Sequence, residues 1–267
     1  MVNFMVDNLI EKASKYIYDC RINHRILNVM QKEYISKTEK EAYLIQNAVH
    51  KLLDQETKDS VIGRKIGCTT KIMQDYLNIK TPCAGRIRSN NCFNSSVELL
   101  FKNYKKVGVE CEIAVSLDSD LYVKKNISHE YLYGAIDKVF TAIEIVDDRY
   151  ENWSLLGANR LIADDFFGAG CVLGDCVPIK NIRDLKKLKG RMYINNNIIG
   201  FGTGADIMKN PILALKWLIE HDDIVQGYLP AGSIVLLGSM VQTHWLKKGD
   251  EVRTIVSEIG ESRVKFI

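Results

Sequence analysis

Three glutamates lie in apolar stretches of the sequence, where a carboxylate is costly unless it is paired or bound to a cation. Glu110 and Glu112 stand two residues apart in "VECEIA", so in a strand both side chains point to the same face. Glu144 in "AIEIV" is flanked by Ile143 and Ile145. The alternation around the first pair also fits a half-exposed antiparallel strand, which is its commoner meaning. Together, three glutamates on two strands would form an all-oxygen acidic site that suits Mg²⁺ or Mn²⁺ better than zinc.

Lys65 in "GRKIGCTT" lies between Gly63 and Gly67 in an otherwise apolar setting. A partly desolvated lysine beside a bound cation can have a lowered pKa and serve in proton transfer. The two glycines favour close approach of a ligand to the backbone, although a surface lysine on an edge strand fits the local sequence equally well. Gly238 and Ser239 in "LLGSM" form either a buried turn of small residues or a donor for a substrate carboxylate.

Other catalytic patterns are missing from the sequence or lie in the wrong context. "GFGTGA" (200–205) matches a dinucleotide-binding fingerprint, but the preceding "INNNI" predicts a hairpin turn and not the start of a βαβ unit. The five histidines have no metal-like spacing, and there is no G-x-S-x-G motif. The seven cysteines include no C-x-x-C pair, so they predict neither a zinc site nor a disulfide framework, in keeping with a reducing compartment.

The composition is that of an ordinary soluble globular protein, with 46% hydrophobic and 26% charged residues among 267. A formal net charge of +3 is too small to argue for nucleic acid or a membrane surface as a partner. The N-terminal sequence carries charges throughout and has no continuous apolar run, so we expect neither a signal peptide nor a membrane span. These features predict a cytoplasmic protein.

The elements that must position the candidate residues change type along the chain. The spacing of apolar residues predicts helices over 6–22, 36–57 with a cap at Ser36 or Thr38, 70–79, about 128–138 and about 211–220. Strands are predicted at 60–69, 107–117, 140–148, 168–179, 191–204, 233–240 and 250–259. The fold class is therefore α+β. We expect a helical N-terminal segment (1–60) and a β-rich domain that holds the metal and the catalytic residues (61–267), together forming one compact unit.

Six blocks in this order resemble the 2-keto-4-pentenoate hydratase and 4-oxalocrotonate decarboxylase branch of the fumarylacetoacetate hydrolase superfamily. They are "TEKEAYLIQ", "GRKIGCTTKIMQDYL", "VECEIA", "AIEIVDDR", "GTGADIMKNPILALKWL" and "LPAGSIVLLGSM…KKGDEVR". The resemblance runs from about residue 36 to the C-terminus. It implies a mixed β-sheet roll with flanking helices and a helical N-terminal segment. It also implies that Glu110, Glu112 and Glu144 are metal ligands for Mg²⁺ or Mn²⁺, and that Lys65 is the active-site lysine.

The resemblance also implies a substrate pocket. Gly238 and Ser239 match the turn that lines it, Asp165 lies where the family usually has an asparagine, and Gly67 is the candidate for close approach of substrate to backbone. Cys83 in "TPCAG" stands where the hydratases usually carry a proton-transferring aspartate. Decarboxylase relatives lack that aspartate too. A thiol with an ordinary pKa near 8.5 transfers a proton only if its pKa is tuned, so the catalytic role of Cys83 is in question.

The activity that the resemblance implies is that of a metal-dependent lyase acting on a small 2-oxo or 2-hydroxydienoic acid, similar to 2-keto-4-pentenoate hydratase. A decarboxylase of the 4-oxalocrotonate type is the first alternative. An acylpyruvate hydrolase is a second, although the catalytic histidine or glutamate that such hydrolases add from an N-terminal lid is not identified in this sequence. A non-catalytic 2-oxo acid binding protein is a third. The family also implies a homo-oligomer that can associate with a related pathway enzyme.

Overall fold

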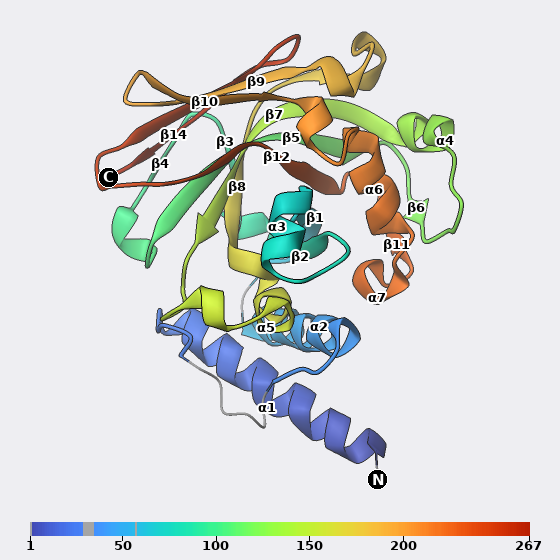
Figure 1. Cartoon of the computed structure of the whole chain (residues 1–267), viewed down its shortest axis with the longest axis vertical. Helices are drawn as coiled ribbons and strands as arrows, with labels where there is room; N and C mark the ends of the chain where they lie inside the picture. Colours follow the sequence, from blue (N-terminus) through green and yellow to red (C-terminus); the bar gives the residue numbers. More distant parts are fainter. Residues whose placement is uncertain (1, 29–34, 57) are drawn as a thin grey trace.

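Two curled β-sheets with helices on their flanks make up the α+β architecture of the computed structural model, which describes residues 2–28, 35–56 and 58–267 (Figure 1). The larger sheet has the strand order β2-β1-β12-β5-β7-β8-β3. Its strands are β1 (Val61–Gly67), β2 (Cys83–Arg88), β3 (Cys92–Asn94), β5 (Val107–Leu117), β7 (Ile136–Asp147), β8 (Gly168–Pro178) and β12 (Ile234–Trp245). The pairs β1–β12 and β3–β8 are parallel and the other neighbours are antiparallel, so the sheet is mixed.

The second sheet has the order β10-β9-β13-β14-β4. Its strands are β4 (Val97–Leu99), β9 (Lys189–Ile194), β10 (Asn197–Thr203), β13 (Glu251–Val256) and β14 (Gly260–Phe266), and a separate pair joins β6 (Leu121–Tyr122) to β11 (Tyr228–Leu229). Asn195 and Asn196 connect β9 to β10 with φ of 50° and 68°. Two consecutive positive φ values are typical of a two-residue hairpin turn, which confirms the hairpin predicted at "INNN".

Helices cover the lower and lateral sides of the sheets in Figure 1. They are α1 (Val2–Ile22), α2 (Glu39–Glu56), α3 (Lys71–Tyr76), α4 (His129–Gly134), α5 (Ala158–Ala163), α6 (Pro211–Ile219) and α7 (Asp222–Val225). Thr38 Oγ1 accepts a hydrogen bond from Glu41 N at 3.1 Å, and the Glu41 carboxylate accepts from Thr38 N at 3.3 Å, so α2 begins with the predicted cap at Thr38. None of the helices in the described ranges is both long and apolar enough to cross a bilayer.

The central strands present different side chains on their two faces. On one face of β5 and β7, large apolar residues such as Ile113, Ile143 and Ile145 are fully buried in the main core. On the other face, Ala114 and Ala142 belong to a smaller apolar cluster. Because alternate residues of a strand face opposite sides, the predicted glutamates share this second face with the small alanines, which leave room beside them.

One predicted helix ends earlier in the structure, and several strands were not predicted. The helix predicted at about 128–138 ends at Gly134, because β7 begins at Ile136 and pairs from there with β5. The pairing buries Val139 in the core. Strand β2 was not predicted, since its sequence "CAGRIR" has charges where a buried strand usually has apolar residues.

Candidate metal centre and active-site cavity

The register of two neighbouring strands brings the three glutamates together. Glu110 of β5 lies directly opposite Glu144 of β7, and Glu112 lies opposite Ala142. One carboxylate oxygen of each glutamate lies within 4.8 Å of one oxygen of each of the other two. Glu112 and Glu144 are buried, and Glu110 is half-buried. The structure therefore places the three side chains in one acidic cluster.

Burial and mutual repulsion make this cluster unfavourable by itself. Burial raises the pKa of Glu112 well above its usual range, and Glu144 and Glu110 raise it further. Burial, followed by the effect of Glu144, raises the pKa of Glu110 to about 7. Gly238 N donates to Glu112 Oε2 at 3.0 Å and the Thr243 hydroxyl donates to Glu110. Glu112 Oε1, however, is buried and has no hydrogen-bond partner among the described residues. Burying such an oxygen without a hydrogen bond is costly unless a positive group lies beside it.

The donor set fits a divalent cation. Carboxylate oxygens are the ligands that Mg²⁺ and Mn²⁺ prefer, whereas zinc prefers nitrogen and sulfur. A cation held by Glu110, Glu112 and Glu144 would offset the repulsion among them and would give Glu112 Oε1 a partner. Three protein ligands leave coordination positions for a substrate and for water.

Lys65 reaches the cluster from β1. Its Nζ lies 3.0 Å from Glu144 Oε1 and donates a hydrogen bond of 2.6 Å to Phe166 O. Burial alone would lower the pKa of Lys65, but Glu144 and Glu110 outweigh burial, so the pKa is raised. The lowered pKa was predicted for a lysine beside a bound cation, which would offset part of the negative charge that the amine faces here, so that lowering stays a prediction. The geometry still places an ammonium group beside the candidate metal ligands.

The turn that accepts the hydrogen bond from Lys65 has an unusual backbone. Asp165, Phe166 and Phe167 follow α5 with φ values of 56°, 50° and 64°. Such values are uncommon for residues other than glycine and persist only where neighbouring contacts hold them. The carboxylate of Asp165 provides those contacts, since it accepts from Arg86 N at 3.0 Å and lies 2.9 Å from Arg21 Nη1.

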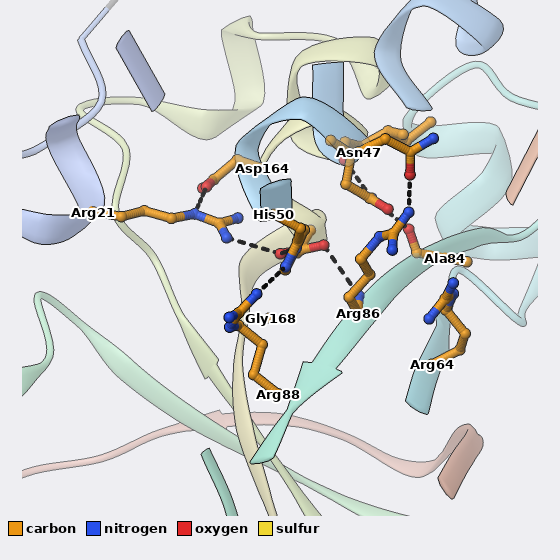
Figure 2. A network of polar contacts seen from close by, with 12 residues as sticks. Arg21, Asn47, His50, Arg64, Ala84, Arg86, Arg88, Asp164 and Gly168 are labelled. Carbon is orange, nitrogen blue, oxygen red and sulfur yellow. Dashed lines mark hydrogen bonds and ion pairs between the residues drawn. The ribbon is translucent and has the colours of Figure 1, made fainter. Parts of the chain in front are cut away.

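His50 completes the network around this turn (Figure 2). Its Nε2 lies 2.6 Å from Asp165 Oδ2 and its Nδ1 lies 3.1 Å from Arg88 Nη1. Because a guanidinium can only donate, Nδ1 is the acceptor and Nε2–H donates to Asp165. Burial lowers the pKa of His50 and thus favours its neutral form. Burial alone would raise the pKa of Asp165, but His50, Arg21 and the Arg86 amide hold it well below its usual range.

A cavity of about 540 Å³ opens beside Lys65, Glu110 and Glu144. The predicted residues Gly67 and Ser239 line it, whereas Asp165 does not and instead contacts the protein groups described above. The prediction of a substrate contact for Asp165 does not match this placement, because all of its partners belong to the buried network.

Gly238 is also outside the lining, but it supports the site through its backbone. It adopts φ of 124°, and a Cβ added there would lie 2.6 Å from Thr69 Cγ2. Only glycine suits such a position, where the amide also donates to Glu112.

Cys83 lies behind the cavity wall. It is buried, does not line the cavity, and shares a hydrogen bond with Cys68, which does line it. The hydrogen bond with Cys68, together with burial, raises the pKa of the Cys83 thiol well above its usual range. A neutral, enclosed thiol is poorly placed to replace the aspartate of the hydratases, and the tuning that catalysis would require goes in the opposite direction.

Sequence reasoning missed the residues of the apolar walls and of the buried network. The walls include Met73, Trp153, Phe166, Phe167 and Trp245. The doublet "FF" directly after Asp165 was a readable signal for an aromatic wall. Arg21 and His50 had no such signal, because they reach the turn from helices far away in the sequence.

Comparisons with known proteins identify the family and the fold. The model of the fumarylacetoacetate (FAA) hydrolase C-terminal family matches residues 82–267. A 2-keto-4-pentenoate hydratase from Paraburkholderia phymatum is 26% identical over 260 residues, which cover 97% of this chain and 98% of that protein. A 2-oxo-hept-4-ene-1,7-dioate hydratase from Escherichia coli is 27% identical over 241 residues, which cover 88% of this chain and 89% of that protein.

Among solved structures, the 4-oxalocrotonate decarboxylase from Pseudomonas putida G7, complexed with magnesium and adipate, superposes with a TM-score of 0.90. The match covers 98% of each chain at 19% sequence identity. At 19% identity this likeness shows the fold alone.

Proposed function

Because the chain belongs to the fumarylacetoacetate hydrolase family, we propose that it is a divalent-metal-dependent lyase acting on small 2-oxo or 2-hydroxydienoic acids. The specific activity we assign is hydration, as in 2-keto-4-pentenoate hydratase. The observation that carries the proposal is the cluster of Glu110, Glu112 and Glu144 beside Lys65, in which Glu110, Glu144 and Lys65 line one cavity. The hydratase names of the relatives support the same activity.

The site residues would have different roles in such a reaction. A bound Mg²⁺ or Mn²⁺ would supply a Lewis acid that stabilises negative charge on the C2 oxygen of the substrate. Lys65 lies where it can hold or move a proton while the dienol becomes a ketone. Ser239 and Thr243 also line the cavity, where their hydroxyl groups donate to Val241 O and to Glu110 and so help to hold the wall beside the glutamates. Aromatic side chains form an apolar wall beside these groups.

Decarboxylation is the second candidate, and one observation favours it. The position of the hydratase aspartate is occupied by Cys83, which is neutral and outside the cavity. Hydration needs a proton donor near the remote double bond. Decarboxylation depends mainly on stabilising the charge left on the 2-oxo acid after CO₂ departs. Both reactions use the same metal ligands, so the ligands do not distinguish them.

Product analysis tests the proposal. The protein would be incubated with 2-hydroxypenta-2,4-dienoate or 2-oxohex-3-enedioate, each with Mg²⁺ or Mn²⁺. Formation of the hydrated 2-oxo acid from the first compound supports the proposed hydratase. Release of CO₂ from the second without hydration of the first would assign the decarboxylase activity. Metal-dependent binding of both compounds without turnover would contradict a catalytic role and identify a binding protein.

A further inference from the structure

One wall of the cavity is a continuous row of aromatic rings that leads from Lys65 to the surface. Lys65 Nζ lies 5.4 Å from the ring centre of Phe166, whose ring lies 5.7 Å from that of Phe167. The ring of Phe167 lies 5.6 Å from that of Trp153, and Trp153 lies 5.5 Å from Tyr76. Tyr76 is 60% exposed, so the row ends in solvent. A substrate held at the glutamates would lay its remote end along these rings.

Other apolar side chains complete the cavity away from the glutamates. Met73 on α3, Phe201 on β10 and Trp245 on β12 are part of its lining. Phe201 is 80% exposed, which is unusual for so large an apolar side chain. A bound apolar group that covers Phe201 would remove this surface from water, so its exposure is explained if it contacts a ligand.

The charges of the lining disfavour a second anionic group. Lys65 is the only cation among the described residues that line the cavity, and Glu144 and the carbonyl of Phe166 already occupy it. Asp206, the remaining charged residue of the lining apart from the glutamates, is itself an anion. Lys106 lies over the ring of Trp245 but is outside the lining, and it is paired with Asp148 at 3.3 Å.

A carboxylate lying along these rings would therefore lose part of its hydration without gaining a positive partner from the lining. Such a loss is costly, and the negative faces of aromatic rings do not offset it. An uncharged apolar tail would instead gain by leaving water, with affinity rising about fourfold for each buried methylene. The volume of about 540 Å³ leaves room for a tail longer than a vinyl group.

We infer that the substrate is a monocarboxylic 2-oxo or 2-hydroxydienoic acid whose remote end is uncharged and apolar, and that Trp153, Phe167 and Phe201 determine this specificity. The inference rests on the proposed function, because it takes the single carboxylate to lie at the metal centre. It separates this chain from dicarboxylate-specific proteins such as the relatives whose names carry a dioate or oxalocrotonate substrate.

The test compares two unreactive ligands of equal chain length, 2-oxohexanoate and 2-oxoadipate, which differ only in a terminal methyl or carboxylate. Calorimetry with Mg²⁺-loaded protein should give at least tenfold tighter binding of 2-oxohexanoate. Equal or tighter binding of 2-oxoadipate would overturn the inference. The proposed function is tested separately in the same experiment, since binding of either ligand that persists after chelation would contradict a metal-bound head group while leaving the preference measurable.

A charge introduced on the wall gives a second, independent test. Phe201→Arg places a cation at an exposed position of the lining and should tighten 2-oxoadipate binding by about tenfold. Ile198→Arg is the matched control, because Ile198 is also exposed on β10 but does not line the cavity. An equal gain in both variants, or no gain in Phe201→Arg, would contradict the assignment of Phe201 to the wall that meets the remote end of the substrate.

Discussion

At the scale of single residues, Lys65 allows the chemical step to be tested separately from metal binding. It contacts Glu144 and a backbone carbonyl but supplies no ligand oxygen. Lys65→Met should therefore lower kcat by about 10²- to 10⁴-fold, the usual range for a positioned proton-transfer group, and change metal affinity by less than about tenfold.

The measurements for this variant are kcat with 2-hydroxypenta-2,4-dienoate at saturating Mg²⁺ and a metal-binding isotherm. Lys138→Met on the exposed side of β7 is the control for loss of a lysine. Near-normal turnover by Lys65→Met would show that Lys65 has a structural role and no role in proton transfer.

For Cys83, in contrast to Lys65, we predict no role in catalysis. Its thiol is neutral, buried and paired with Cys68, so it should take no part in proton transfer. Cys83→Ala should keep turnover within about threefold of the unmodified protein, as should the exposed control Cys176→Ala. Steady-state kinetics at pH 7 and 8.5 would check this. A loss of turnover confined to Cys83→Ala and greater than tenfold would show that the thiol is catalytic.

At the scale of elements, the left-handed turn after α5 depends on polar groups from α1, α2 and β2. Asp165 receives hydrogen bonds or ion pairs from Arg21, His50 and the amide of Arg86. Asp165→Asn removes the charge while keeping an acceptor, and should lower the free energy of unfolding at pH 7 by about 1–3 kcal/mol. Since the turn carries the carbonyl that accepts from Lys65, kcat should fall as well.

The pH dependence of stability shows whether the charge of Asp165 or the shape of its side chain stabilises the turn. Its folded pKa lies below the unfolded value of about 3.9, so its contribution is present above that value and is lost as pH falls toward the folded pKa. The stability difference between the unmodified protein and Asp165→Asn should thus shrink below about pH 4 in denaturant titrations. The exposed control Asp118→Asn should show little difference at any pH. A difference independent of pH would contradict the electrostatic account.

At the scale of the whole molecule, the acidic site was predictable from the sequence and the cavity around it was not. The period-two spacing places Glu110 and Glu112 on one face of a strand, because strand geometry is local, and the family resemblance adds Glu144 as the third candidate ligand. The walls bring together α3, the segment around Trp153, and β10, which are far apart in the sequence. Such packing depends on tertiary contacts that local patterns do not encode.

The dependence on tertiary contacts also explains the errors in the predicted helices and strands. Strand β2 carries Arg86 and Arg88, whose charges obscure its apolar alternation until Asp165, Asp59 and Asn47 are known to lie beside them. The raised pKa of Lys65 has a related cause, since the carboxylates that it faces come from strands far away in the sequence, while the lowered pKa expected beside a bound cation stays a prediction.

Binding of Mn²⁺, followed by the electron paramagnetic resonance signal of the free ion, tests the central claim most directly. The glutamate cluster predicts one Mn²⁺ per chain, and Glu144→Gln should weaken binding at least 100-fold while circular dichroism shows an unchanged fold. Glu98→Gln on the exposed edge of β4 should bind as the unmodified protein does. Unchanged Mn²⁺ affinity in Glu144→Gln, or no binding by the unmodified protein, would contradict the account.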